Sequence, residues 1–384
     1  MHGGLATQAR RAYEAAGMLF TLHLDLLYQC DLDCEHCYLD DKRREVLPTA
    51  FWIDVLDQAA ALGVFSVILS GGEVFLRKDL LELIAHARRR GLFVHLKSHG
   101  GHIDRTVARR LAAVGPSTVM LSYYASDAAI HDAITRRPGS HARARAALAH
   151  LVESGITTIA SCLVMHRNRD AWPALVAECR TLGVQVVVDR TVQGALSGDP
   201  FPLDLALGLA DAVAVERQLL EHATDDCAIA APMPHADWGD RKSCTAGHSS
   251  LYVSPEGDVM PCVMWPLPLG NLARGDRLAD LWRGGPGAGQ LDRIRAQRRR
   301  DRAVCATCEV REDCDFCAGQ AFVQSGDPGA AITSFCLKTR AKTLARAARL
   351  GLPEPPLPAG LVEHPDGPGG PKPPRFVVRA APRS

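Results

Sequence analysis

Cys30-Asp31-Leu32-Asp33-Cys34-Glu35-His36-Cys37 contains three cysteines that are separated by three residues and then by two. This loop follows an apolar, alternating segment, residues 20–27, which predicts a β-strand. The close spacing lets three thiolates converge on one small metal centre, and three ligands leave one coordination position open. An open position predicts that a substrate or a cofactor binds there.

Taken alone, the loop also fits a zinc site, with His36 or His23 as the fourth ligand. The next apolar run favours another assignment, because residues 65–69 end in Ser70-Gly71-Gly72-Glu73. Two motifs therefore lie at the same ends of consecutive predicted strands. This combination resembles the radical S-adenosylmethionine (SAM) superfamily.

Strand-like and helix-like segments alternate regularly up to about Val192. The alternation predicts an α/β fold with parallel strands and outer helices, and six units fit the partial (β/α)6 barrel of that superfamily. Ligands gather at the C-terminal ends of such strands, where both motifs lie. The predicted strands are 20–27, 65–69, 92–97, 118–123, 156–164 and 184–192, and the predicted helices are 49–62, 79–90, 104–114, 141–153 and 170–182. Thr49, Asp79 and Asp104 are the predicted N-caps.

The composition describes an ordinary soluble enzyme, with 384 residues, 47% hydrophobic residues and a formal charge of +1. It gives no reason to expect nucleic acid or a membrane as a partner. No apolar run approaches the roughly 20 residues of a membrane span, and the first residues lack the apolar core of a signal peptide. The 13 cysteines are clustered and odd in number, which favours metal clusters in a reducing cytoplasm over disulfides.

The resemblance implies that Cys30, Cys34 and Cys37 hold a [4Fe-4S] cluster, whose fourth iron binds the amino and carboxylate groups of SAM. Reductive cleavage would then release a 5′-deoxyadenosyl radical. The residues expected to complete the cofactor site are Gly71, Gly72, Glu73, Ser122, Arg143, His36 and Tyr38. A Gly-Gly turn and an ordinary surface arginine are the structural alternatives for Gly71-Gly72 and Arg143. The chain departs from its relatives at Lys97-Ser98-His99-Gly100, where Thr-Asn-Gly is common.

A second group of cysteines resembles the SPASM domain, which carries two auxiliary [4Fe-4S] clusters. The resemblance assigns Cys305, Cys308, Cys314 and Cys336 to the distal cluster, and Cys244, Cys262 and Cys317 to the nearer one. The fourth ligand of the nearer cluster is Cys227, or that position is open to substrate. A buried unpaired thiol is the alternative for Cys227. Two residues separate Cys314 from Cys317, one fewer than in the family, and structural zinc is the alternative.

The expected organisation is a partial radical SAM barrel followed by a loop-rich SPASM domain that iron–sulfur clusters hold together. Its predicted parts are an N-terminal extension (1–19), the barrel (20–192), a bridging region (193–242), the SPASM domain (243–350) and a Pro/Gly-rich tail (351–384).

The leading hypothesis for function is radical crosslinking or oxidation of a ribosomally made peptide, which a separate leader-binding protein would present. Flavodoxin or ferredoxin would supply electrons. The alternatives are modification of a small molecule or tetrapyrrole precursor, sulfatase maturation, and a non-enzymatic scaffold or electron carrier. Sulfatase activators have an aspartate directly after the GxxxxC cysteine, whereas Val263 follows Cys262 here. Candidates for handling the substrate radical are Tyr123, Tyr124, His99, Asp189 and Arg190. A core or structural role is the alternative for each of them.

Overall fold

The computed structural model describes residues 5–39, 41–42, 46–195, 201–222, 238–242, 244–285 and 287–359. The chain forms two compact units. The first contains residues 1–191 and 245–296, and the second contains residues 192–244 and 297–384.

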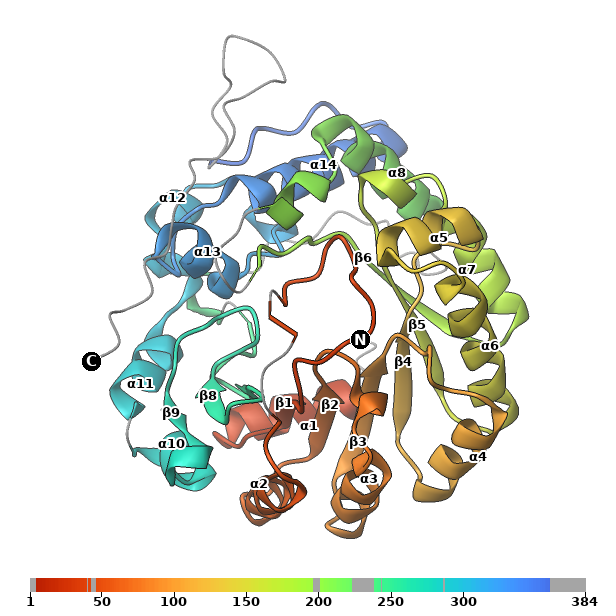
Figure 1. Cartoon of the computed structure of the whole chain (residues 1–384). Helices are drawn as coiled ribbons and strands as arrows, with labels where there is room; N and C mark the ends of the chain where they lie inside the picture. Colours follow the sequence, from red (N-terminus) through yellow and green to blue (C-terminus); the bar gives the residue numbers. More distant parts are fainter. Residues whose placement is uncertain are drawn as a thin grey trace. The chain divides into compact units, whose positions relative to one another are not determined.

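The first unit is built on a nine-stranded sheet with the order β6-β5-β4-β3-β2-β1-β7-β8-β9 (Figure 1). Strands β1 to β6 pair in parallel with their neighbours, which confirms the six predicted strands. Their bounds are β1 Thr21–Asp25, β2 Ser66–Ser70, β3 Phe93–Ser98, β4 Thr118–Ser122, β5 Thr158–Leu163 and β6 Gln185–Asp189.

Each consecutive pair of these six strands is joined through at least one helix. The joining helices are α2 Thr49–Ala61, α3 Leu80–Arg89, α4 Arg105–Val114, α5 Ala128–Thr135, α6 Ser140–Glu153 and α7 Trp172–Thr181. The sequence predicts all of them except α5. Figure 1 shows α2, α3, α4 and α6 on the outer side of the curved sheet. The unit also contains α1 Leu5–Ala15, α10 Leu278–Arg283 and α11 Ala288–Ala296.

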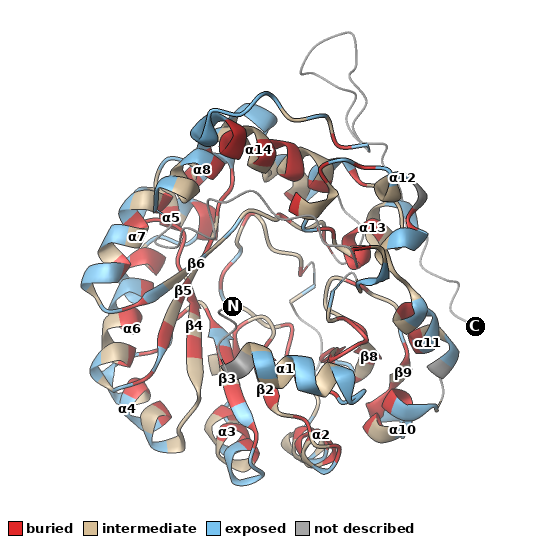
Figure 2. Ribbon diagram, turned by 180° about the vertical axis from the view of Figure 1, so that it is seen from behind, coloured by how far each residue is buried: buried red, intermediate tan, exposed pale blue. Residues whose placement is uncertain are grey.

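The core lies between the sheet and its outer helices. Alternate strand residues such as Leu22, Leu24, Val67 and Leu69 are fully buried. Figure 2 shows buried residues along the strands and on the helix sides that face them. Intervening positions are often polar, as in Thr21-Leu22-His23-Leu24-Asp25, because side chains alternate between the two faces of a strand. The other face of the sheet therefore carries groups that can do chemistry.

One of the three predicted N-caps is confirmed in full. The carboxylate of Asp104 accepts a 2.7 Å hydrogen bond from the backbone N–H of Val107 at the start of α4. Asp79 occupies the N-cap position of α3 without a capping hydrogen bond, since its carboxylate binds Arg77 and Thr49 instead. The prediction for Thr49 is wrong, because Pro48 is the N-cap residue of α2.

Three further strands extend the sheet beyond the predicted six. They are β7 Ser250–Val253, β8 Asp258–Met260 and β9 Gly270–Asn271. β7 pairs in parallel with the open edge of β1, and β8 and β9 add an antiparallel meander. Residues 245–296 thus belong to the barrel unit, whereas the sequence places them in a loop-rich second domain. The backbone ladder between β1 and β7 accounts for this difference.

The second unit contains a short helical turn at Phe201–Leu205, α8 Leu209–His222, α12 Ala303–Ala306, α13 Ala318–Ser325 and α14 Thr333–Leu350. α14 packs beside α8 (Figure 1). The 18-residue α14 lies in a stretch for which the sequence predicts mainly loops. No helix in the described parts of the chain combines the length and apolar character needed to cross a lipid bilayer.

Candidate active site

The two glycines after β2 support the base of the cysteine loop. Gly72 N donates a 2.8 Å hydrogen bond to the carbonyl of Leu27, and Glu73 N donates one of 2.8 Å to the carbonyl of Gln29. A Cβ at Gly71 would lie 2.3 Å from the Leu27 oxygen, and one at Gly72 would lie 2.1 Å from the Gln29 oxygen. Glycine is therefore required here by contact with the protein's own backbone.

The predicted cluster ligands are close enough to influence one another. Burial raises the pKa of Cys30 to about 11, and burial together with the charges of Cys37 and Cys30 raises the pKa of Cys34 to about 12. The backbone N–H of Leu32 donates to Cys30 Sγ at 3.4 Å, and such N–H···S bonds stabilise thiolates. The amine of Lys42, which donates to the Leu32 carbonyl at 2.6 Å, adds positive charge beside the loop.

Glu73 is fully buried and already has partners within the chain. Its carboxylate accepts hydrogen bonds from Ser98 Oγ at 2.9 and 3.0 Å and from His99 N at 2.9 Å. His99 Nε2 lies 3.1 Å from Glu73 Oε2 and 2.9 Å from Asp31 Oδ1. The unusual Ser98-His99 pair thus positions Glu73. His99 also lies beside Cys30, because the ligand atoms of Cys30, Asp31 and His99 all lie within 4.8 Å of one another.

Two other predicted residues, one from the cysteine loop and one that follows β4, are in contact. Tyr124 is buried, and its hydroxyl lies 3.1 Å from His36 Nε2. The two rings meet edge to face at 4.9 Å. Burial lowers the pKa of His36 to about 4, which keeps the imidazole neutral. Tyr124 and His36 form one group just after Ser122, the last residue of β4.

The remaining rim candidates differ in their surroundings. Tyr123 is fully buried, and its hydroxyl lies 2.9 Å from His141 Nε2 and donates to Glu178 Oε2 at 2.8 Å, so it points towards α6 and α7. It continues the helix-facing positions of β4. Asp189 accepts from the backbone N–H groups of the two residues that follow it, at 2.6 and 2.9 Å, which stabilises a local turn.

Arg143 is exposed in the first turn of α6. A Cβ built at Gly101, in the loop after β3, would lie 3.7 Å from Arg143 Nε. The guanidinium therefore lies at the C-terminal ends of the strands, on the same rim as the cysteine loop.

The structure also shows a buried network around Asp25 that the sequence did not predict. Asp25 Oδ2 accepts from Tyr252 Oη at 2.9 Å and from Tyr38 Oη at 3.2 Å, and His23 Nε2 lies 3.1 Å from Asp25 Oδ1. Burial alone would raise the pKa of Asp25, but His23, Tyr252 and the charge of Lys97 lower it. The hydroxyl of Tyr38, predicted for the adenine pocket, thus points to Asp25. The polar alternation in β1 is the sequence signal for this network.

His23 and Tyr252 also line a cavity of about 250 Å³ in the first unit. Cys262 and Val263 border the same cavity, and Cys262 Sγ accepts a 3.5 Å hydrogen bond from Met264 N. The residue after Cys262 therefore offers this cavity no carboxylate, whereas His23 offers it an imidazole.

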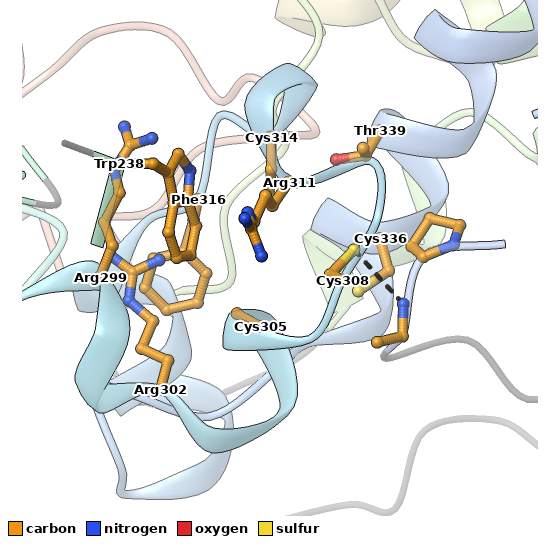
Figure 3. Close-up of a pocket in the computed structure, with 12 residues that line it drawn as sticks. Trp238, Arg299, Arg302, Cys305, Cys308, Arg311, Cys314, Phe316, Cys336 and Thr339 are labelled. Carbon is orange, nitrogen blue, oxygen red and sulfur yellow. Dashed lines mark hydrogen bonds between the residues drawn. The ribbon is translucent and has the colours of Figure 1, made fainter. Parts of the chain in front are cut away.

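Four cysteines of the second unit line a single cavity (Figure 3). They are the predicted distal ligands Cys305, Cys308, Cys314 and Cys336. Cys308 Sγ accepts a hydrogen bond from Ala359 N at 3.5 Å. The four-thiol donor set around one cavity fits a [4Fe-4S] cluster, and the Cys30 loop fits a cluster with one open iron.

The predicted ligands of the nearer cluster come from both units. Cys262 belongs to the first unit, and Cys244 and Cys317 belong to the second. Cys317 Sγ accepts from Gln320 N at 3.5 Å and caps α13. Cys227 lies outside the described residues, so the nearer cluster stays a prediction. Cys162 and Cys179 are fully buried, as expected for core cysteines.

Comparison with known proteins agrees with this arrangement. The radical SAM superfamily matches residues 26–178, and the iron–sulfur cluster-binding SPASM domain matches residues 244–309. The chain belongs to the radical SAM superfamily, among the members that carry a SPASM domain. Enzymes of this class bind SAM and iron–sulfur clusters.

Particular relatives are similar over most of their length. The PqqA peptide cyclase of Xanthomonas euvesicatoria is 30% identical over 365 residues, which cover 90% of this chain and 95% of that protein. The PqqA peptide cyclase of Rhodopseudomonas palustris is 27% identical over 330 residues, covering 83% and 86%.

Two solved structures show the same fold. Streptococcus suis SuiB bound to precursor peptide SuiA has a TM-score of 0.66 at 18% identity, covering 86% of this chain and 79% of that one. The enzyme anSMEcpe with bound AdoMet and a peptide has a TM-score of 0.68 at 14% identity, covering 87% and 98%.

Proposed function

We propose that this enzyme modifies a ribosomally made peptide by radical crosslinking or oxidation. The observation that carries the proposal is the 30% identity to a peptide cyclase over 90% of the chain. When bound, the cluster and SAM supply the 5′-deoxyadenosyl radical that abstracts a hydrogen atom from the substrate. The chain's own contribution is to hold these groups and to exclude water from the buried surroundings of Glu73 and Tyr124.

We assign the binding of SAM to the rim of the barrel. Arg143 and Ser122 would bind the carboxylate of its methionine portion, and a guanidinium suits that contact. His36 would lie against the adenine. Ser98 and His99 hold the carboxylate of Glu73 in place, and a contact of Glu73 with the SAM ammonium group would add to these bonds.

Three [4Fe-4S] clusters complete the proposal, with Cys30, Cys34 and Cys37 at the first. Cys305, Cys308, Cys314 and Cys336 would hold the distal cluster. Cys244, Cys262 and Cys317 would hold the nearer one, with Cys227 or substrate as its fourth ligand. A separate leader-binding protein would present the peptide, and flavodoxin or ferredoxin would deliver electrons.

Sulfatase maturation is disfavoured by one observation. Val263, not an aspartate, borders the cavity next to Cys262. Modification of a small molecule or tetrapyrrole precursor is the second candidate, since the cavity beside His23 has room for a substrate of modest size.

The test is an anaerobic incubation of the reconstituted enzyme with SAM, dithionite and a synthetic peptide encoded beside its gene. The expected product is a peptide lighter by two hydrogens, formed with 5′-deoxyadenosine, and absent for Cys34→Ala. Formation of 5′-deoxyadenosine with every neighbouring peptide left unmodified would favour the small-molecule candidate.

A further inference from the structure

The cavity of the distal cysteines is rich in positive charge. The described residues that line it include three arginines, Arg299, Arg302 and Arg311, and no aspartate or glutamate. Figure 3 shows the guanidinium of Arg311 pointing among the cysteines, with Arg302 and Arg299 on the side of Phe316 and Trp238. Arginine side chains are mostly exposed to solvent, so three of them around a cavity lined by thiols need a physical explanation.

Arg302 is the most deeply buried of the three, with 6% of its surface exposed. Its Cζ atom lies 3.7 Å from the centre of the Phe316 ring, which fixes the guanidinium by a cation–π contact. This guanidinium and Cys305 line the same cavity. Arg302 is therefore a fixed positive charge in the cavity of the predicted ligands.

The other two arginines are also held in place. Arg311 donates to the carbonyl of Ala306 at 2.6 Å, and its Cζ lies 4.9 Å from the Trp238 ring centre. Arg299 lies 5.7 Å from the same ring centre. All three side chains thus keep their charges near the cysteines without depending on a flexible surface position.

Fixed positive charge affects a thiolate-bound cluster in a defined direction. Reduction of a [4Fe-4S] cluster adds one electron and no compensating cation. A buried guanidinium therefore stabilises the reduced form more than the oxidised form, and charge and hydrogen bonds to sulfur are the main influences on cluster potentials.

We propose that Arg302, supported by Arg299 and Arg311, raises the reduction potential of the distal cluster, so that this cluster carries electrons and does more than hold the second unit together. The four cysteines would hold a cluster that could take one electron from a reduced iron–sulfur centre or flavin and pass it on to a second, oxidised centre of the same kind. Arg302 would favour the reduced form and would itself exchange neither proton nor electron. The inference rests on the cluster of the proposed function, but it needs no peptide substrate.

The test is an EPR-monitored redox titration of the anaerobically reconstituted full-length enzyme. The signal that disappears in Cys308→Ala identifies the distal cluster. In Arg302→Met and Arg302→Gln we expect unchanged iron content and a lower potential, with the reduced-to-oxidised ratio at fixed potential falling about tenfold, or about 59 mV for one electron. Arg302→Lys keeps the charge and should titrate close to the wild type.

The matched control is Arg300→Met, which removes an exposed arginine paired with Asp240 in the same segment. It should leave the potential unchanged. If both neutral Arg302 variants lose iron, Arg299→Met becomes the test. The proposal then requires a lower reduction potential of the distal cluster in Arg299→Met than in the wild type.

Wild-type potential in the neutral variants that retain iron, or an equal shift in Arg302→Lys, would overturn the proposal. So would zinc in this cavity, which gives no such signal. Failure of the proposed function would give a different result. The peptide would stay unmodified, and the neutral Arg302 variants would still show a lower reduction potential.

Discussion

Arg167 binds the buried carboxylate of Glu35 through two parallel hydrogen bonds, from Nε to Oε1 at 2.9 Å and from Nη2 to Oε2 at 3.0 Å. Glu35 lies between Cys34 and Cys37, and its backbone N–H donates to the carbonyl of Ile134 in α5 at 2.9 Å. Arg167 follows β5, so the pair ties the cysteine loop to the far part of the barrel. A bidentate guanidinium–carboxylate pair fixes geometry as well as charge.

Arg167→Met should loosen the cysteine loop. The substitution leaves Glu35 buried without its guanidinium, and we expect a loss of about 1–2 kcal/mol of loop stability. The iron bound by the Cys30 loop should then dissociate faster under a chelator, measured as the decay of the visible absorbance. Arg169→Met, which changes an arginine of the same segment, is the control and should behave as the wild type. Equal decay rates for Arg167→Met and wild type would contradict this role.

Gly72→Ala should abolish the active loop conformation. The new Cβ would lie 2.1 Å from the Gln29 carbonyl oxygen and 2.5 Å from that of Tyr28. Backbone must move to relieve such contacts, at a cost of about 2–4 kcal/mol. We expect no 5′-deoxyadenosine and a lower melting temperature.

Gly289→Ala is the matched control for Gly72→Ala. Gly289 lies in α11, and a Cβ added there would have no neighbouring atom within 4 Å. Alanine favours a helix over glycine by about 0.5–1 kcal/mol, so this variant should be slightly more stable and fully active. Normal activity of Gly72→Ala would show that the close backbone contact is not required.

Asp25 and Tyr252 should be energetically coupled. Tyr252→Phe removes the hydroxyl that donates a hydrogen bond to the buried carboxylate of Asp25, and Asp25→Asn replaces that charged acceptor with a neutral amide. Each single variant should lower stability by about 1–3 kcal/mol, and the double variant should lose less than their sum because the two groups share one interaction. Strict additivity in thermal melting would contradict the network.

His131 should make the barrel unit sensitive to acid. Its Nδ1 accepts a 3.2 Å hydrogen bond from Tyr124 N, and burial followed by the charge of His141 lowers its pKa to about 4. Only the unfolded chain binds this proton between the ordinary pKa of 6.5 and about 4. Stability should therefore fall as pH drops through that window, by at most about 1.4 kcal/mol per pH unit from this group.

His131→Asn tests this pH dependence, because an amide oxygen can accept the same bond without titrating. The melting temperature of the variant should decrease less than that of the wild type when the pH is lowered from about 7 to about 5.5. Identical slopes for the two proteins would assign the acid sensitivity to other groups.

The cysteine loop, the glycine pair and the six parallel strands could be predicted because each depends on local spacing or periodicity. Asp104 caps α4 through a bond to a residue three positions away, which is also a local signal. β7 could not be predicted, since a strand of four residues is stabilised by pairing with β1, its distant neighbour in the chain. The Asp25 network depends on the same pairing, because Tyr252 lies on β7.

Local sequence patterns also did not predict the directions in which side chains at the strand ends point. Tyr123 and Tyr124 are adjacent at the end of β4, yet one binds α6 and α7 and the other binds His36. A one-residue difference in strand register exchanges these two roles. Helix α14 was missed because its buried face consists largely of small alanines and threonines among basic residues, which give a weak apolar pattern.

The central claim is that Cys30, Cys34 and Cys37 hold a cluster with one iron open to SAM. The most direct measurement is 5′-deoxyadenosine formed from SAM and dithionite by the anaerobically reconstituted enzyme, compared with its Cys30→Ala, Cys34→Ala and Cys37→Ala variants. We predict 5′-deoxyadenosine from the wild type and none from the three variants. An enzyme that binds zinc in this loop, or that releases no 5′-deoxyadenosine when its iron content is complete, would contradict the account.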